Sequence, residues 1–558
     1  MSRKTKQIQT KTKQKEIFDF DVIIGKYFYY ILPVLVILYY FYSTISDGFY
    51  QDDEIGHFYS MVRFWDNPFS ILGNWAKPGY KIIFVLPSLL GYHFVVFCNT
   101  IITALTVLMV YLVGKQLKIK NSSIIAILFA FQPFILQFSF RCYAEMLTGL
   151  LVLLTLYFYY KKNYILTAIF STWTFAVRQE FALISIILGV IFIIPLYKKL
   201  FDKTDQEIQD KPLKYYLIHN LLPFFILGFS PVLIDVLGYI AHGDPFYLFT
   251  DMKNIGVEML MPKKGFFHYP SMLIFIVGPV SFGLFLLGYF GFLRKKNVAK
   301  EYFANYGMLF TVFTIYFFVQ VLLAWDYVNI GANPGSLRYI IPISPIVALI
   351  GGVGLEYILK GESKKYIYTI LGIAVIITLT FLSYKTDKTI MLSEKEYFKF
   401  AIMLILFSLA LFTIELKMNQ KILLVLITIL GIGFTVIDEK PMKLDPERIV
   451  VKQVAEWWKE KGYDNRVTLN NHIFFFFTLG IDQNKNIEKF PVLVKANLQK
   501  APVGSIVIWD SHYNNRPEYH LDVPMEFFEN NPNFKFIDQF LSSNRRFGIL
   551  VFEKIKDY

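Results

Sequence analysis

The sequence has few cysteines and lacks the short motifs of several large enzyme classes. Only two cysteines, Cys98 and Cys142, occur among 558 residues, and both lie in or beside apolar segments. This excludes a disulfide framework and a CxxC metal site. The sequence also has no P-loop, no GxSxG, no HExxH, and no GxGxxG in a strand–helix context. Nucleotide-dependent and zinc-hydrolase chemistry therefore receive little support.

Charged residues are also scarce, at 18% of the chain, whereas hydrophobic residues reach 55% and the mean hydropathy is +0.44. Repeated apolar runs of about 17–25 residues predict an all-α polytopic membrane protein. The segment 82–113 exceeds one straight span, which predicts a break near Pro87. We expect about thirteen spans, near residues 27–46, 82–113, 122–138, 143–160, 165–179, 181–197, 216–240, 271–292, 305–325, 338–359, 367–384, 399–416 and 420–437.

The net charge of +13 does not indicate a nucleic-acid partner, because of where the excess lies. Residues 438–558 contain seventeen basic and seventeen acidic residues, so the excess falls within 1–437, mostly in short loops. Loops on the N-terminal side carry about twice as many Lys and Arg as the others, which predicts a cytoplasmic N-terminus. An odd number of spans would place the C-terminal segment outside.

Three regions follow from these patterns. Residues 1–26 form a basic cytoplasmic tail, and 27–437 form the transmembrane domain, with an outer loop at 47–81. Residues 438–558 predict a small α/β extracytoplasmic domain. In it, PERIVVKQVAEWWKEKG is predicted as an amphipathic helix and MEFFENNPNF as a helix that runs into a turn. RVTLNN and GSIVIWD are predicted as strands, and FKFIDQFLS and RRFGILVFEKI as a β-hairpin.

The outer loop carries the densest group of charges near the apolar runs. Asp52, Asp53 and Glu54 follow one another directly after the first span, with His57 downstream and Lys77 before the next span. Adjacent carboxylates at a bilayer surface repel each other and cost free energy to bury. The loop is therefore either a solvated helix cap or a membrane-surface active site with a carboxylate as general base.

Helical spacing of apolar residues continues through this loop. The pattern predicts a helix lying on the membrane surface, with Glu54 and His57 on another face. On such a helix Asp53 and His57 would share a face. A carboxylate there, with its pKa raised by the neighbouring carboxylates, could accept the proton of an attacking hydroxyl. Interfacial packing is the alternative for His57. The apolar positions are Ile55, Phe58, Met61, Val62 and Trp65.

Further charges lie at the outer ends of later spans. Arg141 and Glu145 are four residues apart and are expected on one helix face, and Arg338 opens a later span. Arg178 and Glu180 occupy another outer turn. Each cation alone is typical of a snorkelling anchor or a local salt bridge. Together with Lys77 they would form a set that can stabilise a phosphate leaving group.

In their order and predicted membrane side, these residues resemble the GT-C superfamily of polyprenyl-phosphate-sugar-dependent membrane glycosyltransferases. The likeness is to the bacterial protein-mannosyltransferase-like and aminoarabinose-transferase-like branch. It covers about residues 25–360. The matching segments are Asp53-Glu54, His57-Phe58, Lys77-Pro78-Gly79, Arg141 to Glu145, Arg178 and LRYIIPISP. A Gly replaces the family's second Pro, and Glu145 replaces its Asp.

The resemblance implies an inverting transfer of a sugar, a mannose-like hexose or similar, from a polyprenyl-phosphate carrier. The acceptor would be a hydroxyl of protein Ser/Thr, lipid or glycan at the outer face of a bacterial inner membrane. Asp53 would be the general base, with Asp52 second and Glu54 as the other catalytic carboxylate. The remaining roles are donor-phosphate binding by Lys77, Arg178, Arg338 and Arg141, and substrate positioning by His57 and Glu145.

Two other functions remain open: a lipid-linked glycan transporter and a catalytically inactive assembly partner. Transporters are expected to carry ionisable groups near the membrane midplane, and an inactive relative is expected to lose the Asp-Glu pair. The expected partners are membrane lipids, the donor and the acceptor, with no nucleic acid. No cofactor is certain, and the sequence leaves a divalent cation and other metal requirements open.

Overall fold

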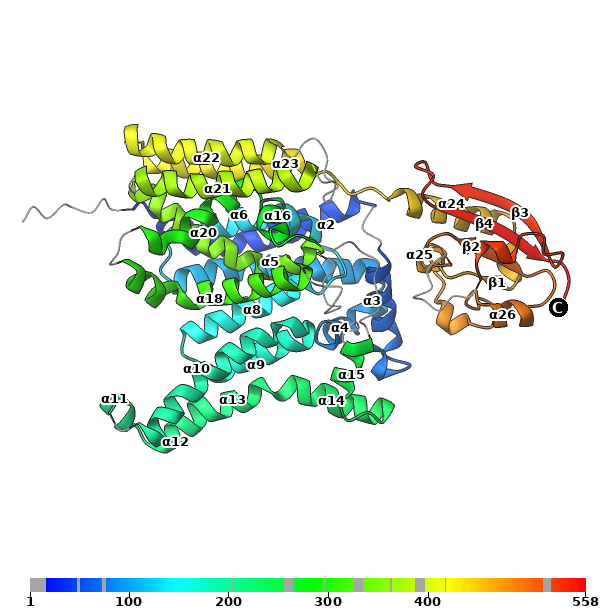
Figure 1. The fold of residues 1–558 in the computed structure, drawn as a ribbon, viewed down its shortest axis with the longest axis horizontal. Helices are drawn as coiled ribbons and strands as arrows, with labels where there is room; N and C mark the ends of the chain where they lie inside the picture. Colours follow the sequence, from blue (N-terminus) through cyan, green and yellow to red (C-terminus); the bar gives the residue numbers. More distant parts are fainter. Residues whose placement is uncertain are drawn as a thin grey trace, which may run out of the picture.

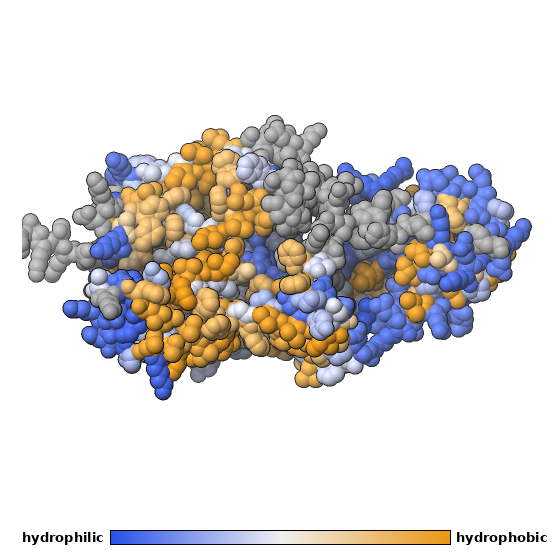
Figure 2. Space-filling view, turned by 60° about the horizontal axis from the view of Figure 1, so that its bottom comes forward, coloured by the Kyte–Doolittle hydropathy of each residue, from blue (hydrophilic) through white to orange (hydrophobic). Residues whose placement is uncertain are grey.

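The computed structural model describes residues 17–47, 51–72, 77–202, 204–254, 264–294, 298–325, 335–361, 364–386, 397–416, 418–514 and 523–557. These residues form a large helical bundle and a small C-terminal module (446–514 and 523–557) beyond one end of it (Figure 1). Apolar side chains cover much of the bundle in Figure 2, and polar side chains dominate the module. This division fits a membrane-embedded bundle with a module in water.

The bundle contains every predicted apolar run as one or more helices. By length and composition, six of the described helices can cross a membrane, or seven if a bent pair at 213–242 is one span. The predicted number of thirteen is therefore not confirmed, because several apolar helices are short or broken. The main helices are α2 (Ile31–Thr44), α5 (Tyr92–Gln116), α6 (Ser122–Ala130), α7 (Pro133–Phe138), α8 (Glu145–Tyr160), α9 (Tyr164–Val177), α10 (Ala182–Phe201), α13 (Leu222–Leu227), α14 (Phe229–His242), α16 (His268–Val277), α17 (Pro279–Tyr289), α18 (Val298–Trp325), α20 (Ser344–Lys360), α21 (Lys364–Thr386), α22 (Tyr397–Leu416) and α23 (Gln420–Asp438).

Helices α17 and α20 cross closely through glycines. A Cβ on Gly288 would lie 1.9 Å from the Ile350 carbonyl oxygen, and one on Gly354 would lie 2.1 Å from that of Leu284. Neither position has room for any side chain. In a membrane the hydrophobic effect does not drive helices together. Close packing of the backbones at small residues stabilises their association instead.

The predicted break near Pro87 is confirmed. The short helix α4 (Pro78–Phe84) is followed by a 3-10 turn, η3 (Pro87–Leu90), and only then by the long helix α5. Proline at the start of α4 and of η3 lacks the N–H that a continuous helix would need, so the chain restarts at each point. The segment is thus divided into two short helical pieces, α4 and η3, followed by one long helix, α5.

The C-terminal module contains a four-stranded sheet in the order β1-β2-β4-β3. The predicted strands and hairpin are confirmed: β1 (Thr468–Leu469) runs parallel to β2 (Ile506–Asp510), and β3 (Phe534–Leu541) pairs antiparallel with β4 (Gly548–Lys554). The predicted first helix is α24 (Pro446–Glu460). MEFFENNPNF forms only a 3-10 turn, Met525–Phe527. Helices α25 (Ile473–Thr478) and α26 (Lys495–Lys500) were not among the predicted elements.

Helix α3 (Asp52–Arg63) confirms the helix predicted in the outer loop, but its surroundings differ from the prediction. It lies at the end of the bundle that faces the module (Figure 1). Met61 is buried in the core of the bundle, whereas Ile55 and Tyr59 are buried in the core of the module. Because both bodies cover it, α3 is not a helix with one apolar face on a membrane surface.

Candidate functional site

The first turn of α3 presents the three consecutive carboxylates. The Gln51 side chain accepts from the Glu54 backbone N–H, and the Gln51 N–H donates to Glu54 Oε2 at 3.3 Å, which closes a capping box. Acidic residues are favourable at this end of a helix because the first backbone N–H groups and the helix dipole are positive there. The three side chains then point to three different partners.

Glu54 is fully buried and pairs with Arg141. Arg141 Nη2 donates to Glu54 Oε2 at 2.8 Å, and the Cys142 backbone N–H donates to Oε1 at 3.1 Å. Burial raises the pKa of the Glu54 carboxyl, and the Arg141 guanidinium opposes this effect. Both oxygens of Glu54 and the head group of Arg141 are therefore committed to each other in this arrangement.

Asp53 makes a more open ion pair. Arg338 Nη1 donates to Asp53 Oδ2 at 2.9 Å, and 36% of the Asp53 side chain is exposed. Within the described part of the chain, Oδ1 of Asp53 has no hydrogen-bond partner. The Arg338 guanidinium also lies over the ring of Tyr143, 4.9 Å from its centroid. Asp53 thus keeps one carboxylate oxygen available beside a fixed cation.

Asp52 is held by the C-terminal module. Arg448 Nη2 donates to Oδ1 at 2.8 Å, and the Tyr513 hydroxyl donates to Oδ2 at 2.5 Å. Sequence reasoning missed both partners, since they lie about 400 or more residues away in the chain. Asp445 and Pro446 in the sequence signal the start of α24, but nothing local predicts that Arg448 reaches α3.

The prediction that Arg141 and Glu145 lie on one helix face is wrong. Helix α8 begins at Glu145, and Arg141 lies in the preceding turn, where it reaches Glu54. Glu145 instead accepts from Arg178 Nη1 at 2.6 Å, and Arg178 Nη2 also contacts Glu180 at 2.5 Å. Irregular backbone at 139–144 separates the two residues, so the four-residue spacing does not apply.

Lys77 provides a cation without a partner among the described residues. It precedes α4 and has a left-handed backbone conformation, with φ of 52°. Burial lowers the pKa of Lys77 to about 8, while Glu145 and Asp53 raise it and Arg178 and Arg338 lower it further. These influences place the Lys77 ammonium among the same charged groups that the sequence singled out.

His57 is buried rather than interfacial. Only 1% of it is exposed, and its ring meets the rings of Tyr80 and Tyr143 at centroid distances of 6.2 and 6.4 Å. Burial lowers the pKa of His57, and the nearby Lys77 lowers it further. His57 therefore lies in a buried aromatic setting rather than at the interface, and its predicted role in substrate positioning stays a prediction.

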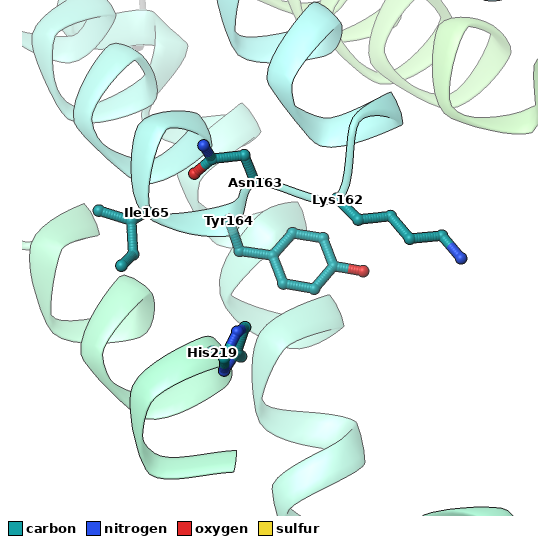
Figure 3. Close-up of a pocket in the computed structure, with 5 residues that line it drawn as sticks. All are labelled: Lys162, Asn163, Tyr164, Ile165 and His219. Carbon is teal, nitrogen blue, oxygen red and sulfur yellow. The ribbon is translucent and has the colours of Figure 1, made fainter. Parts of the chain in front are cut away.

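An open pocket lies at the other end of α8 and α9, at the turn between them (Figure 3). It has a volume of about 290 Å³, and its lining residues are Lys162, Asn163, Tyr164, Ile165 and His219. Glu145 begins α8 and Arg178 follows α9, so both helices lie between this pocket and the charged groups. The pocket contains none of the predicted site residues.

No protein-family model and no curated protein matches the chain. Among solved structures, it is similar to the apo form of ArnT from Cupriavidus metallidurans, with a TM-score of 0.51 and 10% identity over 94% of this chain and 98% of that chain. ArnT belongs to the aminoarabinose-transferase branch of GT-C enzymes. The fold of this chain is GT-C-like. ArnT bound to undecaprenyl phosphate gives a TM-score of 0.49 and 11% identity, over 95% and 98% of the two chains. Such low identity shows the fold alone.

Proposed function

We propose that this protein is a glycosyltransferase that moves a sugar from a polyprenyl-phosphate carrier to a hydroxyl acceptor at the outer face of a bacterial inner membrane. The observation that supports it most is the partly exposed Asp53 carboxylate beside Arg338, together with Lys77, which has no partner among the described residues and whose charge interacts with that of Asp53. A base and phosphate-binding cations are the two parts that such a transfer needs. The GT-C-like fold and the undecaprenyl phosphate bound by ArnT agree with this choice of carrier.

Asp53 is the best candidate for the general base among the three carboxylates. Glu54 has both oxygens in contact with Arg141 or backbone N–H groups, and Asp52 has both oxygens held by the module. Asp53 alone of the three combines exposure with an oxygen that has no partner in the described structure. This oxygen would take the proton of the acceptor hydroxyl as the hydroxyl oxygen attacks the anomeric carbon.

The bond from the anomeric carbon to the phosphate oxygen would break as the new C–O bond forms, and the phosphate would leave with the electron pair. Attack opposite the leaving group inverts the anomeric centre. Lys77 and Arg338 would stabilise the charge that develops on the phosphate. Arg178 is saturated by Glu145 and Glu180 and would contribute its charge from behind them.

The proposed orientation has the N-terminus in the cytoplasm and the module outside, where a carrier-linked sugar is accessible. The charge bias of the loops supports it. A reporter that is active only outside the membrane, fused after Tyr558, should be active. A stable but inactive fusion would reverse the orientation and place the carboxylates on the cytoplasmic side.

The test of the chemistry compares Asp53→Asn with Asp52→Asn in purified protein. General-base catalysis typically contributes about 10²–10⁴-fold, so Asp53→Asn should lower the transfer rate by that factor while donor binding survives. Asp52→Asn should reduce the rate less and serves as the matched control. Both variants need thermal stability equal to that of the wild type.

Two outcomes would contradict the assignment. If Asp52→Asn loses the activity and Asp53→Asn keeps it, the base is Asp52 and the module takes part in the chemistry. If both variants keep the wild-type rate on a polyprenyl-phosphate donor, neither carboxylate is the base and the proposed mechanism fails.

A further inference from the structure

A cluster of two histidines and a glutamate lies in the module, beside its contacts with Asp52. Glu447 comes from the first turn of α24, His472 precedes α25, and His512 lies in the turn after β2. Glu447 Oε1 is 3.1 Å from His472 Nε2 and 2.6 Å from His512 Nδ1. The proposed glycosyl transfer uses none of these three side chains.

We propose that Glu447, His472 and His512 form a zinc site. One ligand atom from each residue lies within 4.8 Å of the other two, so small side-chain movements would bring all three to metal-binding distances. Two imidazoles and one carboxylate are a ligand set that suits Zn²⁺, whereas Ca²⁺ and Mg²⁺ prefer oxygen ligands alone. With three protein ligands, one position of a tetrahedral ion stays open to water.

The hydrogen bonds of the two histidines show which ring nitrogens must lose a proton before they can bind zinc. His472 Nδ1 accepts from the Phe474 backbone N–H at 3.3 Å, so its Nε2 carries the proton and donates to Glu447. His512 likewise donates from Nδ1. On zinc binding, the ring nitrogen of each histidine that faces Glu447 would lose its proton, to the other ring nitrogen or to water, and give the freed lone pair to the ion. The 3.3 Å hydrogen bond from the Phe474 N–H would be lost, and its free energy is small compared with that of a metal–ligand bond.

The surroundings of the cluster hold the ligands in place. Asp510 is fully buried, and its Oδ1 accepts from the backbone N–H groups of His512 at 3.0 Å and Tyr513 at 2.7 Å. The ring of His512 stacks on that of Tyr513 at 4.6 Å. These contacts fix the turn that carries His512, and supporting shells of this kind orient metal ligands.

The position of the cluster gives the ion a role in assembly. Glu447 immediately precedes Arg448, and His512 immediately precedes Tyr513, the two residues that bind Asp52. An ion held by three separate segments would cross-link them and fix both of these neighbours against the acidic end of α3. The zinc site would thus hold the module in its place beside the carboxylates.

The test measures zinc binding to the full chain in detergent, after removal of metals with a chelator. After Zn²⁺ is added back and unbound metal is removed, we expect one Zn²⁺ per chain by elemental analysis. Calorimetry on the metal-free protein should show binding of Zn²⁺ but not of Mg²⁺ or Ca²⁺. His512→Asn and Glu447→Gln should each weaken Zn²⁺ binding about tenfold or more. His219→Asn, a change at an exposed histidine of the bundle, should bind as the wild type does.

A second measurement uses the wild type alone, in case a variant fails to fold. Zn²⁺ should raise the thermal unfolding temperature of the metal-free protein, because an ion that binds only the folded state stabilises it. The proposal fails if the wild type binds no Zn²⁺, or binds it with the same affinity as the His512→Asn variant. The three side chains would then form a hydrogen-bonded cluster without a metal. Equal affinity for Mg²⁺ would overturn the proposal as well. None of these measurements requires a sugar donor, so the result is independent of the proposed transferase activity.

Discussion

The neighbouring carboxylates of α3 differ in burial and in partners between the side that faces the bundle and the side that faces the module. Toward the bundle, Glu54 is fully buried and pairs with Arg141. Toward the module, Asp52 is partly exposed and is held by residues from the other end of the chain. Asp53 lies between them and pairs with Arg338 at the open edge. Identical charges at adjacent positions therefore acquire different roles from their burial and partners.

The energies of these pairs explain the difference. A fully buried charge such as that of Glu54 depends on a partner and hydrogen bonds, and removal of one partner leaves the other charge uncompensated in a low dielectric. An exposed pair contributes little to stability, typically about 0–1 kcal/mol. We infer that the pair on the bundle side maintains the fold, whereas the half-exposed pair can exchange partners during a reaction.

The largest expected effect on stability is that of Glu54→Gln. The variant leaves the buried Arg141 guanidinium without its counter-charge, and breaking such a pair typically costs about 3–5 kcal/mol. Chemical unfolding in detergent should show this loss, whereas Asp53→Asn should change the free energy of unfolding by about 1 kcal/mol or less. Equal stability of the two variants would remove the contrast between the two sides of α3.

Next in size is the effect of Lys77→Ala on the donor. A charge-assisted hydrogen bond to phosphate contributes about 1.5–3 kcal/mol, so the affinity for a polyprenyl-phosphate sugar should fall about tenfold or more. Arg338→Ala should act in the same direction. Lys485→Ala removes an exposed cation that pairs with Asp66 and provides the control. If Lys77→Ala and Arg338→Ala bind the donor as tightly as Lys485→Ala does, Lys77 and Arg338 do not contact phosphate.

A pH titration of donor binding refines this result. Because burial lowers the pKa of Lys77 to about 8 in the free protein, the ammonium is charged at pH 7 and loses its proton as the pH rises. Donor affinity should therefore be highest below pH 8 and decline above it. Lys77→Arg should abolish the decline, since the guanidinium stays charged. A wild-type affinity that is constant from pH 7 to 9 would argue against this assignment.

The smallest effect is expected at the contact between α3 and the module. Tyr513→Phe removes one hydrogen bond to Asp52, and such bonds contribute about 0.5–1.5 kcal/mol each. A double-mutant cycle of Tyr513→Phe with Asp52→Ala should return a coupling of this size in the free energy of unfolding. A coupling indistinguishable from zero would mean that the module is not held through this hydroxyl in solution.

Local features of the fold could be predicted from the sequence. The helix at 52–63, the break near Pro87 and the C-terminal hairpin follow from spacing, proline and turn residues. The GT-C-like fold agrees with the order of charged residues at the predicted outer ends of the spans. These properties depend on residues that are close together in the chain or on one repeated period.

The pairing of charges could not be predicted in the same way. Arg141 and Glu145 have helical spacing, but the irregular turn between them directs Arg141 to Glu54. Glu447, His472 and His512 are 25 and 40 residues apart and form no recognisable ligand spacing. Such contacts depend on how distant segments pack, for which local periodicity carries no information.

The left-handed backbone at Lys77 has a consequence for selection and engineering. A residue other than glycine seldom adopts a φ of 52°, and the proline that follows restricts it further. Lys77→Gly would relieve this strain while it removes the ammonium, so the variant should unfold at the same or a higher temperature and bind the donor weakly. A screen for thermostable variants would therefore favour the loss of Lys77, and only a screen for turnover would retain it.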